Sequence, residues 1–472
     1  MAERCDRRGI AVSTKGAGKK YEIDMVNGVL APKILLFAVP LLLSSMLQLM
    51  FNAADIVVVG RFGTNGARSI AAVGATGALI NLIVALFIGI SVGVNVLVAR
   101  YYASRQQRNL SETVHTAVMV GIVGGVIVGA IGIIIAAPVL KMMGTPDDVL
   151  TLSAEYMRIY FAGAPALLIY NMGSAILRAI GDTRRPLIFL VISGTANVLL
   201  NILFVVTFKM DVAGVAAATV ISEAISAGLI IMCLMRTKEG YRLILRELKF
   251  NRHKLGMMLK IGIPAGLQGM IFSFSNVLIQ SSVNSFGSVA MAGNAAAANL
   301  EGFVYMAMNS VYQASVSFTS QNYGAGDLKR VNRVLVTCLV IVFAVGFLMG
   351  NAFYLFGRGL LSVYTDDPQA IAFGVKRMGV ICTLYFLCGT MDTICGCLRG
   401  LGWSVVPMIV SLIGACGFRI VWIYTYFAKH RDLTVLYSSY PISWTITGAA
   451  HLICFFLIMR HIRRTHGTVS ES

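Results

Sequence analysis

Acidic side chains are scarce in the long apolar stretches of this 472-residue chain, and the few that occur there are candidates for chemistry. In the first half they are Asp55, with Asn52 one helical turn before it, and Glu223. In the second half they are Glu301 and Asp392. A carboxylate in an apolar environment is costly unless it is paired or hydrated, so such residues usually serve a function. The chemistry that they suggest is the reversible binding of a cation.

Each acid also has a structural interpretation. Asp55 lies near the end of an apolar stretch, where hydration or capping of a helix would explain it, and a basic or polar neighbour would explain Glu223. In the second half we expect Arg419 to neutralise either Glu301 or Asp392, which leaves the other acid free to attract a cationic substrate. Aromatic residues of the same stretches can line a cavity beside these acids: Phe303, Tyr305 and Tyr385.

The elements that carry these residues are predicted to cross a membrane. Hydrophobic residues make up 57% of the chain and charged residues only 13%, whereas soluble proteins carry about 25% charged residues. The stretch from Ile261 to Leu300 contains no charge and would form ~60 Å of helix, enough to cross a ~30 Å hydrocarbon core twice. The apolar runs predict twelve spans: 34–60, 70–99, 113–138, 155–178, 186–208, 212–235, 256–286, 289–320, 333–356, 371–398, 404–428 and 440–460.

The basic residues predict the orientation of these spans. With the N-terminus in the cytoplasm, 28 Lys and Arg residues fall on the cytoplasmic side, 7 on the other side and 4 within spans. We therefore expect both termini in the cytoplasm and the protein in the plasma (inner) membrane. The net charge of +18 then reflects topology and anionic lipid headgroups, and no nucleic-acid partner is expected.

Two other compositional features bear on the class of protein. The stretch before the first apolar run is polar and basic and shows no signal peptide. The nine cysteines lie mostly within the spans, so we interpret them as reduced packing residues and expect no metal site.

An internal repeat organises the spans. LRAIGDTRRP at Leu177 recurs as LRGLGWSVVP at Leu398, and further pairs join spans 1 and 7 at almost the same spacing, among them Pro40 with Pro264. Spans 1–6 and 7–12 are therefore two copies, related as parallel repeats because an even number of spans returns the chain to its starting side. The predicted parts are a cytoplasmic tail 1–33, a first lobe 34–235, a basic linker 236–255, a second lobe 256–460 and a cytoplasmic tail 461–472.

The repeated motif and the linker are interpreted as structural. Arg178 and Arg399 stand at helix ends where they can meet phosphates and carbonyls, and the glycine and proline that follow allow a tight reversal. The linker sequence YRLILRELKF is expected to lie along the membrane surface as an amphipathic segment. GIVGGVIVGAIG in span 3 is typical of small-residue helix packing.

Several stretches together resemble the multidrug and toxic compound extrusion (MATE) transporters. They are QLMFNAADIVVVGRFG in span 1, AAVGATGALINLIVALFIGISVGVNVLVARYYAS in span 2, the two copies of the LRxxG motif, GVAAATVIS in span 6 and FTSQNYGAGD after span 8. The resemblance covers nearly all of residues 34–462. It implies an all-α membrane protein in which two six-helix lobes form a V and exchange organic cations or related amphiphiles for H⁺ or Na⁺. Arg100 departs from the family, which usually has Gln before the Tyr-Tyr pair.

The resemblance also implies a site for the coupling ion. Asp55 matches the family's coupling-ion aspartate. The polar positions beside it are matched by Asn171, Asn197, Asn201 and Thr219. Asn197 and Asn201 stand one helical turn apart and share a helical face. Some family members have Asp where Asn201 stands, and Glu223, one turn beyond Thr219, can supply a second acid here.

The energy source follows from what the chain lacks. KGAGKKY has Ser13 in place of the first glycine of a phosphate-binding loop, so uphill transport must use an ion gradient, worth ~3.5 kcal/mol per charge at ~150 mV. We expect a monomeric antiporter without cofactor or enzymatic activity. The alternatives are a lipid-linked oligosaccharide flippase, whose anionic cargo needs a basic cavity, and a membrane-embedded transferase. For the transferase, the acidic groups at 146–148 and 365–368 lack spaced partner acids.

Overall fold

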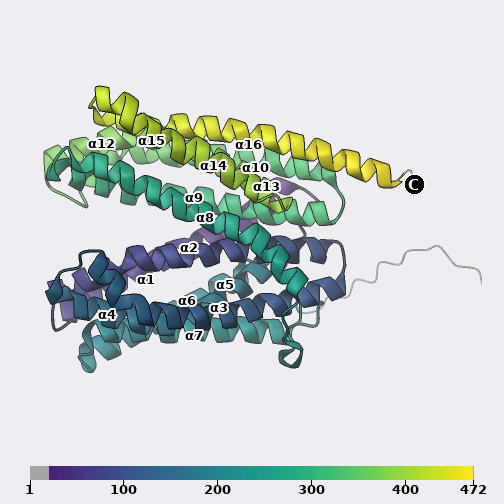
Figure 1. Cartoon of the computed structure of the whole chain (residues 1–472), viewed down its shortest axis with the longest axis horizontal. Coiled ribbons are helices and arrows are strands. Elements are labelled where there is room, and N and C mark those ends of the chain that lie inside the picture. The colour runs from purple at the N-terminus through teal and green to yellow at the C-terminus, as the bar shows by residue number, and fades with distance from the viewer. Residues whose placement is uncertain (1–20, 471–472) are drawn as a thin grey trace, which may run out of the picture.

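The computed structural model describes residues 21–470, and within them the secondary structure is helical (Figure 1). The parts of the two predicted tails at 1–20 and 471–472 lie outside the described residues. Eight of the nine cysteines are described, and all eight are free thiols.

The first six spans form the N-lobe. Its span 4 is a bent pair of helices, and its span 5 ends in a π-helical turn. The elements are α1 (Leu30–Phe62), α2 (Ala67–Ala103), α3 (Gln107–Met142), α4 (Asp147–Ala162), α5 (Ala164–Ala179), α6 (Arg184–Asn201), η1 (Ile202–Thr207) and α7 (Asp211–Arg236).

The last six spans form the C-lobe, which follows a short 3₁₀ turn, η2 (Leu245–Glu247). Its span 10 is again a bent pair, and its span 11 is interrupted by π-helical turns. The elements are α8 (Arg252–Asn284), α9 (Ser288–Gly324), α10 (Leu328–Leu355), α11 (Gly357–Leu361), α12 (Pro368–Ile381), α13 (Phe386–Gly400), α14 (Val405–Ser411), η3 (Leu412–Gly417), α15 (Phe418–Trp422), η4 (Ile423–Phe427) and α16 (Leu433–Ser470).

Helix length and composition account for eleven of the twelve predicted spans. Among residues 21–470, nine helices are long and apolar enough to cross a membrane, and two bent pairs pass the same test together. The twelfth span is α9, which is long enough but carries many polar residues. Those side chains are buried within the protein, Asn294, Glu301 and Gln321 among them, so α9 is a central helix surrounded by its neighbours.

The two copies of the repeated motif form the same turn. Gly181 and Gly402 both have positive φ, at 96° and 91°. In each copy the glycine N–H donates to the carbonyl three positions back, and the next N–H donates to the carbonyl five positions back, at 2.8–3.1 Å. This is the Schellman ending of a helix, which needs a residue in the left-handed region. The predicted tight reversal is therefore confirmed.

The repeat extends to irregular features of the spans. The bends in spans 4 and 10 are 48° and 44°. The π-helical turns η1 and η4 begin at Ile202 and Ile423, which have the same spacing along the chain as Leu177 and Leu398. Local irregularities that recur at the spacing of the sequence repeat show that the two lobes are copies in structure as well.

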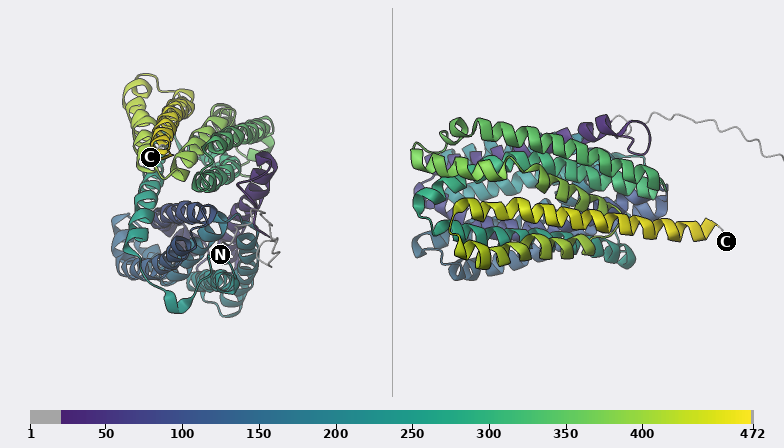
Figure 2. Two further views of the ribbon diagram at one scale, coloured as in Figure 1. Left: turned by 90° about the vertical axis from the view of Figure 1, so that its right-hand side faces the viewer. Right: turned by 90° about the horizontal axis from the view of Figure 1, so that it is seen from above.

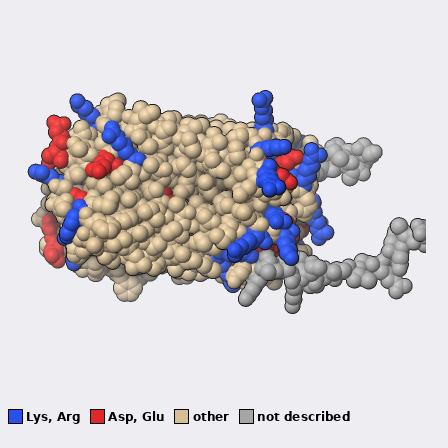
Figure 3. Space-filling model, turned by 90° about the horizontal axis from the view of Figure 1, so that it is seen from below, with Lys and Arg blue, Asp and Glu red and all other residues tan. Residues whose placement is uncertain are grey.

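The charged residues define two ends of the helical bundle, separated by a belt that is nearly free of charge (Figure 3). The basic end holds residues 21–29 and the connections at 104–106, 180–183, 237–251, 325–327 and 401–404. The opposite end holds the connections at 63–66, 143–146, 208–210, 285–287, 356–367 and 428–432.

Seen end-on, the two lobes lie side by side (Figure 2). They approach closely near the basic end, where a Cβ at Gly93 would lie 2.3 Å from the Met258 carbonyl oxygen and one at Gly324 would lie 2.4 Å from that of Arg100. Helix α2 of the N-lobe lies along α8 of the C-lobe, with Gly89 so close to Gly266 that a Cβ at Gly89 would lie 2.5 Å from the Gly266 Cα. Buried hydrogen bonds also join the lobes, from Ser317 Oγ to Asn95 Oδ1 at 3.1 Å and from Gln321 Nε2 to the Ala179 carbonyl at 2.7 Å. The lobes are thus closed towards the basic end.

Both flanking segments contact the helices. Within residues 21–29 of the predicted tail, Met25 is fully buried and Glu22 accepts hydrogen bonds from Tyr102 and Tyr241 at 2.9 and 2.7 Å, whereas Asp24 and residues 27–29 are exposed. In the linker, Tyr241 and Leu243 point into the N-lobe core, because alternate residues of this extended stretch face the protein. The expected position of the linker along the membrane surface stays a prediction.

Candidate functional site

A buried polar cluster surrounds Asp55 in the N-lobe. Asp55 lies on α1 and is 7% exposed. Its Oδ1 accepts a hydrogen bond from Asn201 Nδ2 of α6 at 2.5 Å, and its Oδ2 accepts one from Thr219 Oγ1 of α7 at 3.4 Å. Asn201 Nδ2 also donates to Asn197 Oδ1 at 3.1 Å. Three helices therefore meet at this carboxylate through neutral side chains.

The cluster contains no basic side chain among the described residues. Among the described residues, the negative charge of Asp55 is therefore balanced only by the dipoles of neutral side chains. The buried Oδ1 atom of Asn201 receives no hydrogen bond from a described residue. Oxygen atoms from a carboxylate, amides and a hydroxyl are the ligand types that a hard cation prefers. A helix cap does not explain Asp55, because its bonds go to two other helices.

Three other predicted residues of this site make no hydrogen bond to the carboxylate. Asn52 is exposed and has no hydrogen bond to the described residues of the cluster, and Asn171 Nδ2 donates to the Leu167 carbonyl of its own helix at 2.9 Å. The Glu223 carboxylate makes no ion pair or hydrogen bond with a described residue, and its Oε2 is buried. Tyr156, which nothing in the sequence singled out, lies near both Asp55 and Glu223.

A different arrangement holds Glu301 in the C-lobe. Arg377 of α12 donates to both of its oxygens, from Nε at 2.8 Å and from Nη2 at 2.7 Å. Arg377 Nη1 also donates to Asn294 Oδ1 at 2.7 Å, and Tyr437 donates to that same oxygen at 3.1 Å. All four side chains are buried. The result is a bidentate ion pair with nearly every donor and acceptor used.

The prediction that Arg419 neutralises an acid was wrong. Arg419 is 3% exposed, and its Nε donates to Ser443 Oγ at 3.0 Å while the guanidinium lies 4.3 Å from the centre of the Tyr440 ring. Arg377 takes the role expected of Arg419. It precedes a bend in span 10, and only the packing of α12 against α9 brings its side chain to Glu301.

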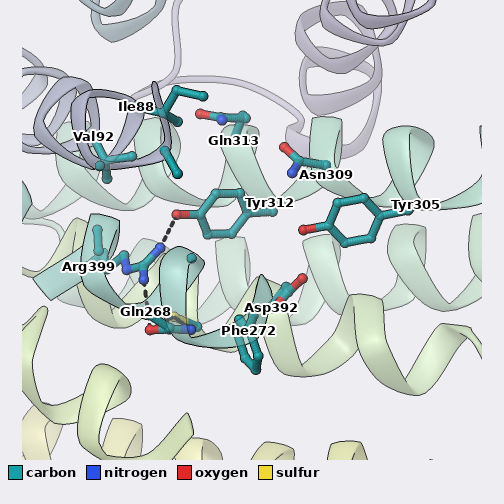
Figure 4. Close-up of a pocket in the computed structure, with 15 residues that line it drawn as sticks. Ile88, Val92, Gln268, Phe272, Tyr305, Asn309, Tyr312, Gln313, Asp392 and Arg399 are labelled. Carbon is teal, nitrogen blue, oxygen red and sulfur yellow. Dashed lines mark hydrogen bonds between the residues drawn. The ribbon is translucent and has the colours of Figure 1, made fainter. Parts of the chain in front are cut away.

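A cavity of about 190 Å³ lies between the lobes, and Asp392 faces it (Figure 4). The Asp392 carboxylate makes no hydrogen bond or ion pair with a described residue. Tyr305, which was expected to line a cavity, lies between this cavity and a second one of about 290 Å³ beside Glu301. The lining of the first cavity comes from α2, α8, α9 and α13: Ala85, Ile88, Gly89, Val92, Ala265, Gln268, Gly269, Phe272, Tyr305, Asn309, Tyr312, Gln313, Asp392, Cys395 and Arg399.

Arg399 belongs to this cavity, although its motif was interpreted as structural and its side chain was expected to meet phosphates and carbonyls at a helix end. It is 6% exposed, donates to Gln268 Oε1 at 2.8 Å and also donates to the Tyr312 hydroxyl (Figure 4). The expectation was wrong for this copy because α13 turns the arginine inward, between α8 and α9. Polar residues in otherwise apolar spans, such as Gln268, were the signal that could have located the cavity.

Inside the C-lobe, away from Lys254 at the basic end of α8, the described spans hold three buried arginines and two acids. The arginines are Arg377, Arg399 and Arg419; of the acids, Glu301 is buried and Asp392 is half-buried at the cavity. One acid is neutralised by an arginine, and the other faces the inter-lobe cavity with an arginine on the same wall. The cavity therefore carries both signs of charge, whereas the sequence had predicted only an unpaired acid there.

Two six-helix lobes with a polar cavity between them define a membrane transporter for small molecules. The MatE family model matches residues 40–207 and 264–425, and the chain belongs to this family of multidrug efflux transporters.

Known proteins of the same kind cover most of the chain. "Probable multidrug resistance protein YoeA" from Bacillus subtilis is 28% identical over 87% of this chain and 90% of its own length. An "FAD transporter" from Shewanella oneidensis is 25% identical over 72% of this chain and 75% of its own. A solved structure described as the outward-facing conformation of a multidrug resistance MATE family transporter has a TM-score of 0.84 at 20% identity. It covers 94% of this chain and 99% of that chain, which supports the two-lobed fold.

Proposed function

We propose that the protein exports amphiphilic small molecules, organic cations among them, in exchange for H⁺ or Na⁺. It would act as a monomer in the plasma (inner) membrane without a cofactor. The basic end would face the cytoplasm, because 28 of the Lys and Arg residues are assigned to that side against 7 on the other. Closure of the lobes towards the basic end would then leave the cavity accessible from outside.

The Asp55 cluster supports the coupling step. A buried carboxylate balanced only by neutral donors can bind a proton or Na⁺, and it loses that ion when the site is hydrated. When the ion is bound, the site is electrically neutral and is stable without water around it. When the ion is absent, the charged carboxylate favours a state of the lobe in which water reaches it. Because Asp55 joins α1 to α6 and α7, occupancy can bias how these helices pack. The ion and the substrate then favour different states of the same lobes.

The single observation that carries the substrate proposal is the Asp392 carboxylate, which faces the inter-lobe cavity without a partner among the described residues. Phe272, Tyr305 and Tyr312 line the same cavity, and aromatic faces attract organic cations. A flat, monovalent, apolar cation would pair with Asp392 and stack on these rings.

The test is transport by the purified protein in proteoliposomes loaded with a fluorescent organic cation such as ethidium. An imposed proton or sodium gradient should drive its uphill movement, and an ionophore that dissipates the same gradient should stop it. Movement that ignores both gradients would overturn the ion-coupled proposal.

A second candidate is transport of an anionic substrate, including a lipid-linked oligosaccharide. It is favoured by the excess of arginines over acids in the described C-lobe spans and by Arg399 on the cavity wall. The relative described as an FAD transporter adds to this candidate. Competition between ethidium and an anionic dye of similar size in the same proteoliposomes separates the two candidates.

A further inference from the structure

A third cavity, of about 490 Å³, lies between the lobes at the basic end. One wall comes from the end of α2 in the N-lobe, and the other comes from α8 and the turn before α14 in the C-lobe. The lining residues are Leu97, Arg100, Met257, Lys260, Ile261, Leu401, Gly402, Trp403, Ser404, Val405 and Val406. Two of them are basic and none is acidic.

The internal repeat supplies a matched comparison for Arg100. Its counterpart in the second copy is Gln321, and the helices end identically after both, with positive φ at Arg105 and Gly326. Gln321 reaches across the lobe interface and donates to the Ala179 carbonyl at 2.7 Å. Its buried amide therefore has an acceptor in the opposite lobe.

Arg100 also reaches across the interface but finds no such acceptor among the described residues. Its guanidinium lies 4.7 Å from the centre of the Tyr323 ring of α9. On the other side is Gly402, where any side chain would come within 2.9 Å of Nη2. Within residues 21–470, its Nε and Nη2 atoms are buried and have no hydrogen-bond partner. The Arg100 side chain therefore lies between the Tyr323 ring and Gly402, and its Nε and Nη2 donors have no acceptor among the described residues.

Other polar groups of the cavity are also without partners. Ser404 is 2% exposed, and its hydroxyl has no hydrogen-bond partner among the described residues. Lys260 is exposed and forms no ion pair with a described carboxylate. Buried donors are normally satisfied, so a ligand with several anionic oxygens would complete this set.

The remaining walls identify the kind of anion. Leu97, Met257, Ile261, Leu401 and Val406 are apolar, so the ligand must bury hydrocarbon next to its charge. Trp403 and Val405 are 41% and 40% exposed and continue the apolar surface outwards. Basic pockets between membrane helices at a membrane boundary bind acidic lipid headgroups.

We propose that this cavity binds an acidic phospholipid, with the phosphate at Arg100, Lys260 and Ser404 and an acyl chain along the apolar walls. Arg100 belongs to the N-lobe, whereas Lys260 and Ser404 belong to the C-lobe. A headgroup can contact all three residues only while the lobes are closed at the basic end. It therefore binds this closed state more tightly than a state in which the lobes separate there. The lipid therefore stabilises that state.

Trp403 provides a local probe, since the chain has three tryptophans and Trp403 lies in the cavity wall. In a variant with Trp422→Phe and Trp444→Phe, lipids with brominated acyl chains quench only Trp403 fluorescence. In nanodiscs, brominated phosphatidylglycerol should quench it more strongly than brominated phosphatidylethanolamine at the same mole fraction. Each basic residue is expected to raise the association constant of phosphatidylglycerol relative to phosphatidylethanolamine on the order of fivefold.

Charge-removing variants test the residues. Lys260→Gln and Arg100→Gln should each reduce the headgroup preference, and Arg100→Lys should retain part of it. Lys260 is exposed, so its substitution leaves folding intact. Arg252→Gln, an exposed basic residue of the same end outside the cavity, should leave the preference unchanged. Equal quenching by both lipids, or a preference that survives in the Arg100→Gln/Lys260→Gln variant, would overturn the proposal.

A free anion is distinguished from a lipid in the same nanodiscs. Inorganic phosphate at constant ionic strength should not displace brominated phosphatidylglycerol, because it buries no hydrocarbon. Displacement by millimolar phosphate would contradict the lipid proposal and assign the site to a soluble phosphate.

Discussion

Asp55 and Glu301 are both buried carboxylates within the spans, one in each lobe, yet their surroundings are opposite in kind. Asp55 is bound by an amide and a hydroxyl, so its charge is met only by dipoles of the described residues. Glu301 accepts hydrogen bonds from Nε and Nη2 of Arg377, so its charge is neutralised. A carboxylate of the first kind can accept a mobile cation, whereas one of the second kind already has a permanent one. The comparison supports the proposal that the N-lobe exchanges the ion, and it gives the Glu301–Arg377 pair a structural role to test in the C-lobe.

A smaller comparison lies within two consecutive residues of α12. Arg377 forms the buried pair with Glu301, while Lys376 forms a surface pair with Asp432 at 2.8 Å. The distances are nearly equal, but the surroundings differ, because the Lys376 and Asp432 side chains are 40% and 51% exposed. Water screens the second pair, so the two are expected to differ several-fold in their contribution to stability.

The largest effect is expected from Arg377→Met. It leaves Glu301 buried without its partner, which should lower the free energy of unfolding by ~3–5 kcal/mol. Thermal unfolding in detergent measures the change as a lower Tm. Adding Glu301→Gln should restore most of the loss, since a buried pair is often replaceable by neutral groups. An Arg377→Met protein as stable as the parent would show that the pair contributes nothing.

The next effect concerns coupling. Asp55→Asn should remove ion-driven efflux while the protein stays folded and still binds substrate, because an amide cannot alternate between charged and neutral forms. The driving force lost is that of one charge, ~3.5 kcal/mol at ~150 mV. Efflux from proteoliposomes under an imposed gradient measures it. Asn52→Ala, one turn away and exposed, is the control and should retain transport. Full gradient-driven efflux by Asp55→Asn would exclude Asp55 from the ion site.

A moderate effect is expected at the inter-lobe cavity. Asp392→Asn should raise the Kd of a monovalent organic cation roughly tenfold through loss of a charged partner. Because Asp392 has no described arginine bonded to it, the Tm should change little, in contrast to Glu301→Gln. Fluorescence titration with ethidium gives the Kd. An unchanged Kd in Asp392→Asn would favour the anionic-substrate candidate.

The smallest effect belongs to the surface pair at the opposite end. The hydrogen bond from Lys376 lowers the pKa of Asp432 to about 2. Since the folded-state pKa is depressed, the pair stabilises the protein above the ordinary carboxyl pKa of about 4, and this contribution is lost as pH falls towards 2. Exposure limits it to ~0.2–1 kcal/mol. The Tm of the parent should therefore exceed that of Asp432→Asn slightly at pH 5, and this difference should be smaller at pH 3. A difference as large as that of Arg377→Met would contradict the comparison.

Sequence reasoning succeeded where a periodic signal was repeated. The apolar runs predicted the spans, and the constant spacing of the repeat predicted two equivalent turns, which Gly181 and Gly402 form. It failed for single side chains. Arg377 was passed over in favour of Arg419, since nothing in the local sequence shows which face of α12 meets α9. Asn52 was selected for its distance along the chain from Asp55, but its side chain is exposed and forms no hydrogen bond with the described residues of the cluster.

Hydropathy and repeat spacing were enough to establish the class of protein: an all-helical membrane protein of two parallel six-span copies. Both are properties of whole segments and survive uncertainty of a few residues at each end. The packing of the helices was needed to establish that Glu301 is paired with Arg377, that Asp392 faces the cavity and that Arg399 lies beside it. The energy of an ion depends on neighbours within a few ångströms, and those neighbours come from helices that are distant in the chain. A rotation of one helix by a third of a turn would change every such pair and leave the hydropathy pattern the same.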